Sequence, residues 1–122
     1  MFINFTNHPS DNWSAEQTAA AHVFGEILDL PFPNVDPNGG EGYIEALAAE
    51  YVTRIAAHRP LAVLCQGEMT LTFAVASLLP LVCNAAVLAA CSARVVTEFA
   101  NEDGMIAKYT AFRFTRFRNY LP

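Results

Sequence analysis

At 122 residues, of which 53% are hydrophobic and 16% charged, the chain is long enough for one domain with a buried core and too apolar to be disordered. No apolar run approaches the about 20 residues that span a membrane, and no secretory signal opens the sequence, so we expect a cytoplasmic protein. The three cysteines lie in apolar surroundings without metal-ligand spacing, which favours reduced thiols and no metal site. The apolar excess also favours burial of part of the surface in a homodimer.

Charge is distributed unevenly along the chain, whose net charge is −5. Residues 1–60 carry eight acids and two bases, whereas residues 61–122 carry four acids and five bases. Arg113, Arg116 and Arg118 fall within six positions. These arginines fit an anion site or, equally well, a charged edge strand in solvent.

The first half of the chain alternates predicted strands and helices. Residues 1–6 form an apolar strand, and Ser14 with Gln17 makes a capping box for a helix that ends near Phe24. A short strand over residues 26–30 leads into a proline-rich loop, residues 31–40, which we expect to be ordered by packing or by a partner. Apolar residues at three- and four-residue steps then predict a helix over residues 43–58.

The second half predicts a buried strand over residues 61–64, a helix over residues 70–79 stopped by Pro80, and a strand over residues 85–90. Two more strands, residues 95–99 and 108–118, form a hairpin. The order βαβαβαβ plus a hairpin predicts one α/β domain over residues 1–122. We expect it to be three-layered and Rossmann-like, with a mostly parallel sheet and a C-terminal β-hairpin.

Ligands of such sheets bind outside the carboxyl ends of the strands. Three polar segments are expected there: residues 4–8, residues 66–70 and residues 92–94. In the second segment, Gly67 allows close backbone approach and Gln66 can contact a base or ribose. Neither a phosphate-binding Walker loop nor a dinucleotide fingerprint is present, so we expect no cofactor.

The roles of the polar residues remain open at this level. Glu68 can act as a general base, and Thr70 can bind phosphate, but Gln66 and Thr70 can equally cap the turn. His8 can transfer protons near neutral pH or simply bond backbone carbonyls. In the last strand the alternation reverses phase near Arg116, which predicts either a bulge or departure of the strand from the core.

Four ordered motifs resemble one family, the small ring nucleases of type III CRISPR systems, which are Rossmann-like and related to the CARF sensor domains. The motifs are Phe5-Thr6-Asn7-His8, Gln66-Gly67-Glu68 with Thr70, Cys91-Ser92-x-Arg94-x-Val96-x-Glu98, and Phe112-x-Phe114-x-Arg116-Phe117-Arg118-x-Tyr120.

The resemblance implies a homodimer that binds cyclic tetra-adenylate or a related cyclic oligoadenylate, with no DNA and no membrane as partner. It further implies ring opening without a metal, by attack of a ribose 2′-OH on the adjacent phosphate, which switches off antiviral signalling. We assign proton removal to Glu68 or His8, and charge stabilisation to Arg94 or a terminal arginine. The expected ligand-binding residues are Thr6, Asn7, Gln66, Gly67, Thr70, Ser92, Arg113, Arg116 and Arg118.

Two other functions fit the same sequence. One is a non-catalytic binder that sequesters or senses the same messenger. The other is a scaffold subunit whose apolar surface serves a protein partner.

Overall fold

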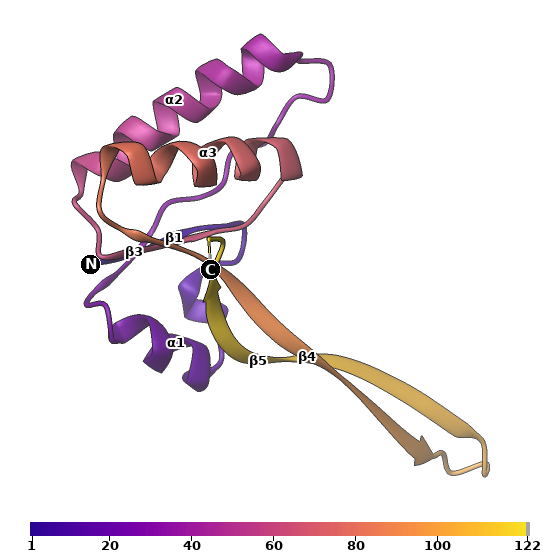
Figure 1. Ribbon diagram of the computed structural model, residues 1–122. Helices are drawn as coiled ribbons and strands as arrows, with labels where there is room; N and C mark the ends of the chain where they lie inside the picture. Colours follow the sequence, from indigo (N-terminus) through magenta and orange to yellow (C-terminus); the bar gives the residue numbers. More distant parts are fainter. Residues whose placement is uncertain (122) are drawn as a thin grey trace.

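The computed structural model describes residues 1–121 and shows a mixed α/β arrangement built on one sheet (Figure 1). The elements in chain order are β1 (Phe2–Phe5), the 3₁₀ turn η1 (Ser10–Asn12), α1 (Ala15–His22), β2 (Ile27–Asp29), α2 (Glu41–Ala57), β3 (Ala62–Cys65), α3 (Met69–Val82), β4 (Ala86–Ala100) and β5 (Ile106–Asn119). Within residues 1–121, none of these helices combines the length and apolar character needed to cross a membrane.

The sheet has the strand order β2-β1-β3-β4-β5. The first four strands run parallel, and β5 returns antiparallel to β4. In Figure 1, α1 lies on one face of the sheet, while α2 and α3 lie together on the other. The predicted α/β class and the C-terminal hairpin are therefore confirmed, in a sheet that is mixed.

The two central strands, β1 and β3, are buried along their whole length. Ile3 and Val63 pack toward α2 and α3, whereas Phe2 and Leu64 pack in the separate cluster that includes Ala21 of α1. A strand covered on both faces needs apolar residues at every position rather than at every second one. This explains why β3 is apolar throughout and why β1 is apolar except at Asn4.

The prediction that α3 ends before Pro80 is wrong, because α3 continues through Pro80 to Val82. Proline in a helix removes one N–H donor, and here it does so only in the last turn. The backbone N–H of Cys83 still donates to the carbonyl of Leu79, so the helix closes beyond the proline.

The predicted loop at residues 91–94 is also wrong. One continuous strand, β4, replaces the two expected strands, and it pairs with β5 from Leu88 to Ala100. Neither glycine nor proline interrupts residues 86–100, so nothing in the backbone ends the strand. Of the two explanations predicted for the reversed alternation near Arg116, a bulge is present: Cys91 pairs with Arg116 and Ser92 with Phe114, which leaves Thr115 as the extra residue.

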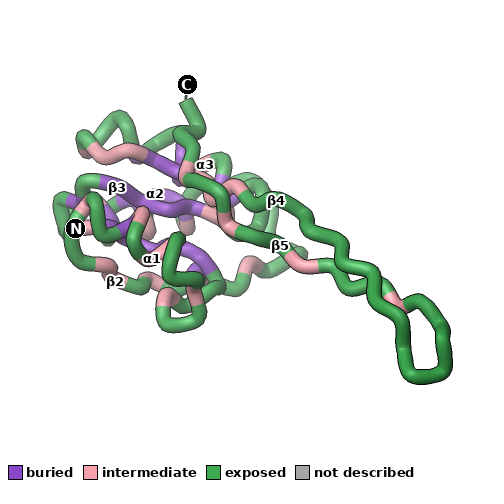
Figure 2. Tube along the Cα trace, turned by 90° about the horizontal axis from the view of Figure 1, so that it is seen from below, coloured by how far each residue is buried: buried purple, intermediate pink, exposed green. Residues whose placement is uncertain are grey.

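The outer part of this hairpin, residues 93–113, leaves the rest of the molecule as a two-stranded ribbon, which we call the arm (Figures 1 and 2). None of its residues is buried. The remainder of the described chain, which we call the body, contains both core clusters.

The proline-rich loop is ordered by packing, as one of the two expected explanations has it. Its Phe32 is buried, and the ring lies 4.7 Å from that of Phe5, centroid to centroid. The N–H of Phe32 donates to the carbonyl of Thr6. The loop thereby joins the core next to the end of β1.

Candidate functional site

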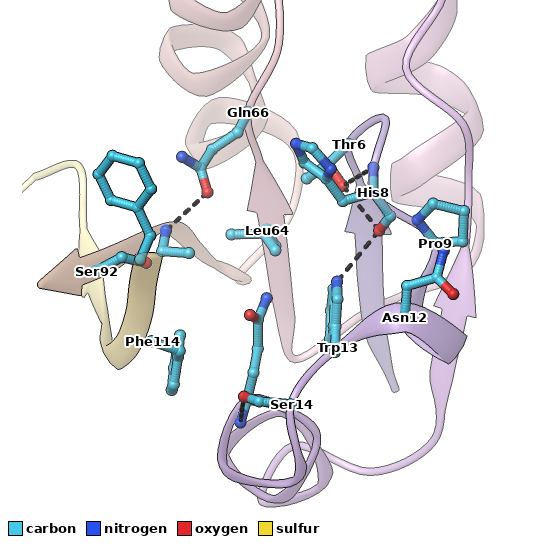
Figure 3. A pocket seen from close by; sticks show the side chains of 13 residues that line it. Thr6, His8, Pro9, Asn12, Trp13, Ser14, Leu64, Gln66, Ser92 and Phe114 are labelled. Atoms are coloured by element: carbon cyan, nitrogen blue, oxygen red, sulfur yellow. Dashed lines mark hydrogen bonds between the residues drawn. The ribbon is translucent and has the colours of Figure 1, made fainter. Parts of the chain in front are cut away.

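A hollow of about 420 Å³ opens where β1 and β3 end, next to the beginning of α1 and the root of the arm (Figure 3). We call it the crevice. It is lined by Thr6, His8, Pro9, Asn12, Trp13, Ser14, Gln17, Leu64, Gln66, Ala90, Ser92, Phe112 and Phe114. Its position outside the carboxyl ends of parallel strands is the one at which α/β sheets bind ligands.

One buried amide, that of Asn4, shapes the loop after β1. Its Nδ2 donates to the carbonyl of His8 and to Oδ1 of Asp29, each at 2.9 Å, and its Oδ1 accepts from the Thr6 hydroxyl at 2.8 Å. Asp29 in turn accepts from the backbone N–H and the hydroxyl of Ser10. A buried polar side chain with all these partners fixes the loop in one conformation.

His8 is held through its backbone. Its carbonyl accepts from Asn4 Nδ2 and, at 3.1 Å, from Trp13 Nε1, while its N–H donates to the hydroxyl of Thr6. The side chain is exposed and lines the crevice (Figure 3). The imidazole therefore stands on a rigid loop with access to solvent, as a proton-transfer group requires.

Gln66, which follows β3, is hydrogen-bonded through its side chain to β4 beside the crevice. Its Oε1 accepts from the N–H of Ala90 at 2.9 Å, and its Nε2 makes none of the hydrogen bonds found among residues 1–121. This amide nitrogen is thus available to a ligand acceptor. Packing explains why residue 67 is a glycine. A Cβ there would lie 2.5 Å from the ring of Phe32, so it is the proline-rich loop, and not a ligand, that approaches the backbone of Gly67 closely.

Glu68 and Thr70 cap α3. The Glu68 carboxylate accepts from the N–H of Thr70 at 3.0 Å, from the N–H of Leu71 at 2.9 Å and from the Thr70 hydroxyl. The hydrogen bond from Leu71, followed by those from Thr70, holds the pKa of Glu68 below its usual value. A carboxylate in this state is a good N-cap and a weak base.

The arginines of β5 lie on the far side of the strand from the crevice. Phe112 and Phe114 line the crevice, so the alternation of side chains places Arg113 on the opposite face. After the bulge, Phe117 packs against Phe2 on the α1 side. Arg116 and Arg118, its two neighbours in the strand, therefore leave on the opposite face as well.

Arg94 is placed differently. It pairs with Phe112 and stands two residues beyond Ser92 on β4, so its side chain leaves the strand on the crevice side. It is exposed and does not line the crevice.

Of the residues predicted from sequence, the structure brings four together in the crevice: Thr6, His8, Gln66 and Ser92. The others lie outside its lining: Asn7, Gly67, Glu68, Thr70, Arg94, Arg113, Arg116 and Arg118. Within residues 1–121, no three His, Cys, Asp or Glu side chains converge as a metal site would require.

Sequence reasoning missed the aromatic wall, formed by Trp13, Phe112 and Phe114. It also missed Asn4 and Asp29. A polar residue inside the apolar strand Phe2–Phe5 was the available signal, since a buried amide in such a strand needs partners.

A family model described as "Uncharacterized protein MJ1673 family" matches residues 1–118. The chain belongs to this family. No curated protein and no solved structure matches the chain. The crevice is therefore interpreted from its own chemistry.

Proposed function

We propose that the chain binds a cyclic oligoadenylate, of the cyclic tetra-adenylate class, in the crevice and opens its ring. The proposal also takes the sheet to be the Rossmann-like arrangement of CARF-related ring nucleases, acting in the cytoplasm on type III CRISPR signalling. One observation carries it: among the thirteen lining residues, amides, hydroxyls and aromatic rings surround a single titratable side chain, His8.

Such a lining suits a nucleoside. Trp13, Phe112 and Phe114 offer faces on which a base can stack, at about 1–3 kcal/mol per base. Gln17 and the free Nε2 of Gln66 offer hydrogen bonds to a base or ribose edge. The lining contains neither Asp nor Glu, so it carries no side-chain charge that would repel a phosphate.

Ring opening requires a proton acceptor for the ribose 2′-OH and a phosphate held in line with it. The ribose 2′-oxygen forms a bond to the adjacent phosphorus while its proton passes to the His8 imidazole. The bond from phosphorus to the 5′-oxygen breaks, and that oxygen takes up a proton from water as it leaves, which yields a 2′,3′-cyclic phosphate at one end and a 5′-hydroxyl at the other. Arg94 lies on the crevice side of β4 but outside the lining, and we assign its guanidinium to balance the phosphorane charge.

The test is incubation of the full chain with radiolabelled cyclic tetra-adenylate in EDTA. We expect linear products over several turnovers, a loss of about 100-fold or more with His8→Ala, and little change with His58→Ala at the end of α2. Product formed equally well by the His8 variant would overturn the role of His8.

A non-catalytic binder is the second candidate, and the placement of Glu68 favours it. With that carboxylate committed to the cap of α3, His8 is left as the one candidate base of the crevice. Tight retention of cyclic tetra-adenylate without product would identify this binder. Absence of binding would leave the scaffold function.

A further inference from the structure

The arm is a segment whose apolar side chains lack cover. Val96, Phe99, Tyr109 and Phe112 are 50%, 51%, 62% and 73% exposed, and Ile106 at its tip is 69% exposed. In Figure 2 the arm projects from the body, and almost all of its residues are exposed. An isolated two-stranded ribbon is at best marginally stable in water. A hairpin of this length therefore needs a surface to pack on.

The solvent-accessible surface area of the chain indicates how large that contact is. The chain exposes 8068 Å². A compact monomer of 13.3 kDa is expected to expose about 6,450 Å². The excess of about 1,600 Å² per chain, when buried by two copies, makes an interface of about 3,200 Å², which is the size found in obligate homodimers.

Charge permits this contact. The arm, residues 93–113, carries three bases and three acids, whereas the body carries four bases and nine acids. The neutral arm of one copy is thus not repelled by the acidic body of another, while two bodies repel each other. This observation points to a second copy of the chain as the occupant rather than to a nucleic acid, which an acidic body would repel.

We propose that the arm is a dimerisation element that packs against a second copy of this chain, with the two arms exchanged reciprocally. The contact uses the face that carries Val95, Phe99 and Tyr109 together with three alanines. Register and alternation place these side chains on one side of the ribbon, where Arg113 is the one charged residue of the paired strands. The other side carries Val96, Ile106, Thr110 and Phe112 among the charged side chains of Arg94, Lys108 and the ion-paired Glu98, so it is the less apolar of the two. The inference is independent of the ligand of the crevice.

The first test shortens the arm. Residues 96–110 are replaced by Asn-Gly, which closes a two-residue hairpin between the paired Val95 and Ala111 and keeps the crevice wall. Sedimentation equilibrium at micromolar concentration should give a dimer for the full chain and a monomer for the shortened one. Circular dichroism should report a folded body in both. A monomeric full chain, or a shortened chain that is still dimeric, would overturn the proposal.

Two neighbouring substitutions test the face. Tyr109→Glu should weaken the dimer at least 100-fold in dissociation constant, whereas Thr110→Glu, on the other face, should change it less than 10-fold. An equal effect of both, or an effect of Thr110→Glu alone, would overturn the assignment of the face.

Discussion

The body and the arm are made from similar residues and differ in what covers them. β1 and β3 are apolar strands with neighbours on both edges and helices on both faces. The arm also carries valine, phenylalanine and tyrosine, yet its two strands have only each other. A β pattern therefore predicts a strand, but not whether this chain alone buries it.

The consequence is that a mutation of the same kind should have different effects in the two regions. Buried rings in the body stabilise the folded chain. Exposed rings in the arm can contribute only when another molecule covers them.

The largest difference is expected between Phe5→Ala and Phe99→Ala. Phe5 is fully buried and stacks on Phe32 and Tyr51, so its truncation should lower the free energy of unfolding by about 3–5 kcal/mol. Phe99→Ala should leave the unfolding of the body within about 0.5 kcal/mol and weaken self-association instead. Urea unfolding followed by Trp13 fluorescence, with sedimentation in parallel, measures both quantities.

The contrast is sharpest in the shortened-arm background, where unfolding does not involve a second copy. Phe5→Ala should have its full effect there. If Phe99→Ala in the full chain destabilised the body as strongly as Phe5→Ala, the separation of body and arm would be wrong.

A smaller effect is expected from Asn4→Ala. The change leaves the Thr6 hydroxyl and the His8 carbonyl without their buried partner, at a cost of about 1–3 kcal/mol. Because the same amide holds the loop that lines the crevice, ligand binding should fall as well. Asn7→Ala, in the same loop but exposed, is the matched control for both measurements. Equal losses in the two variants would contradict the role of the buried amide.

Much of the body could be predicted because each of its elements has a local signal. The capping interaction of Ser14 with the N–H of Gln17 is present, and every strand and helix of the body lies within a few residues of its predicted position. The length of β4 could not be predicted, because the residues at 91–94 suggested a loop while their pairing with β5 keeps them extended.

For the site, the sequence predicted correctly only which segments meet, because the order of the strands alone decides that. Thr6 and Gln66 follow the ends of β1 and β3, and Ser92 lies just beyond Leu88, the last residue of β4 that pairs with β3. The direction in which a side chain points depends on the position of bulges and on local hydrogen bonds, which the order of strands and helices does not determine. The bulge at Thr115 turns Arg116 and Arg118 away from the crevice, and a local cap takes up the carboxylate of Glu68.

The smallest expected effect concerns that cap, and it separates a structural Glu68 from a catalytic one. The hydrogen bonds from Leu71 and Thr70 favour the charged form in the folded chain, so the pKa of Glu68 is lower in the folded chain than its ordinary value of 4.5. The contribution to stability is therefore complete above pH 4.5 and is lost as the pH falls through the folded-state pKa. Glu68→Gln should lower the urea midpoint slightly at pH 7, and the difference from the native chain should shrink toward pH 3.

Glu45→Gln, on the exposed face of α2, is the control and should show no such difference. If Glu68→Gln instead left the urea midpoint unchanged at both pH values but abolished cleavage of cyclic tetra-adenylate, the carboxylate would be acting as the base and not as the cap. An unchanged urea midpoint at both pH values together with retained cleavage would fit neither role. Under the proposed function, the outcome expected from the geometry is a pH-dependent loss of stability with cleavage unaffected, because the three hydrogen bonds that lower the pKa of Glu68 also weaken it as a proton acceptor.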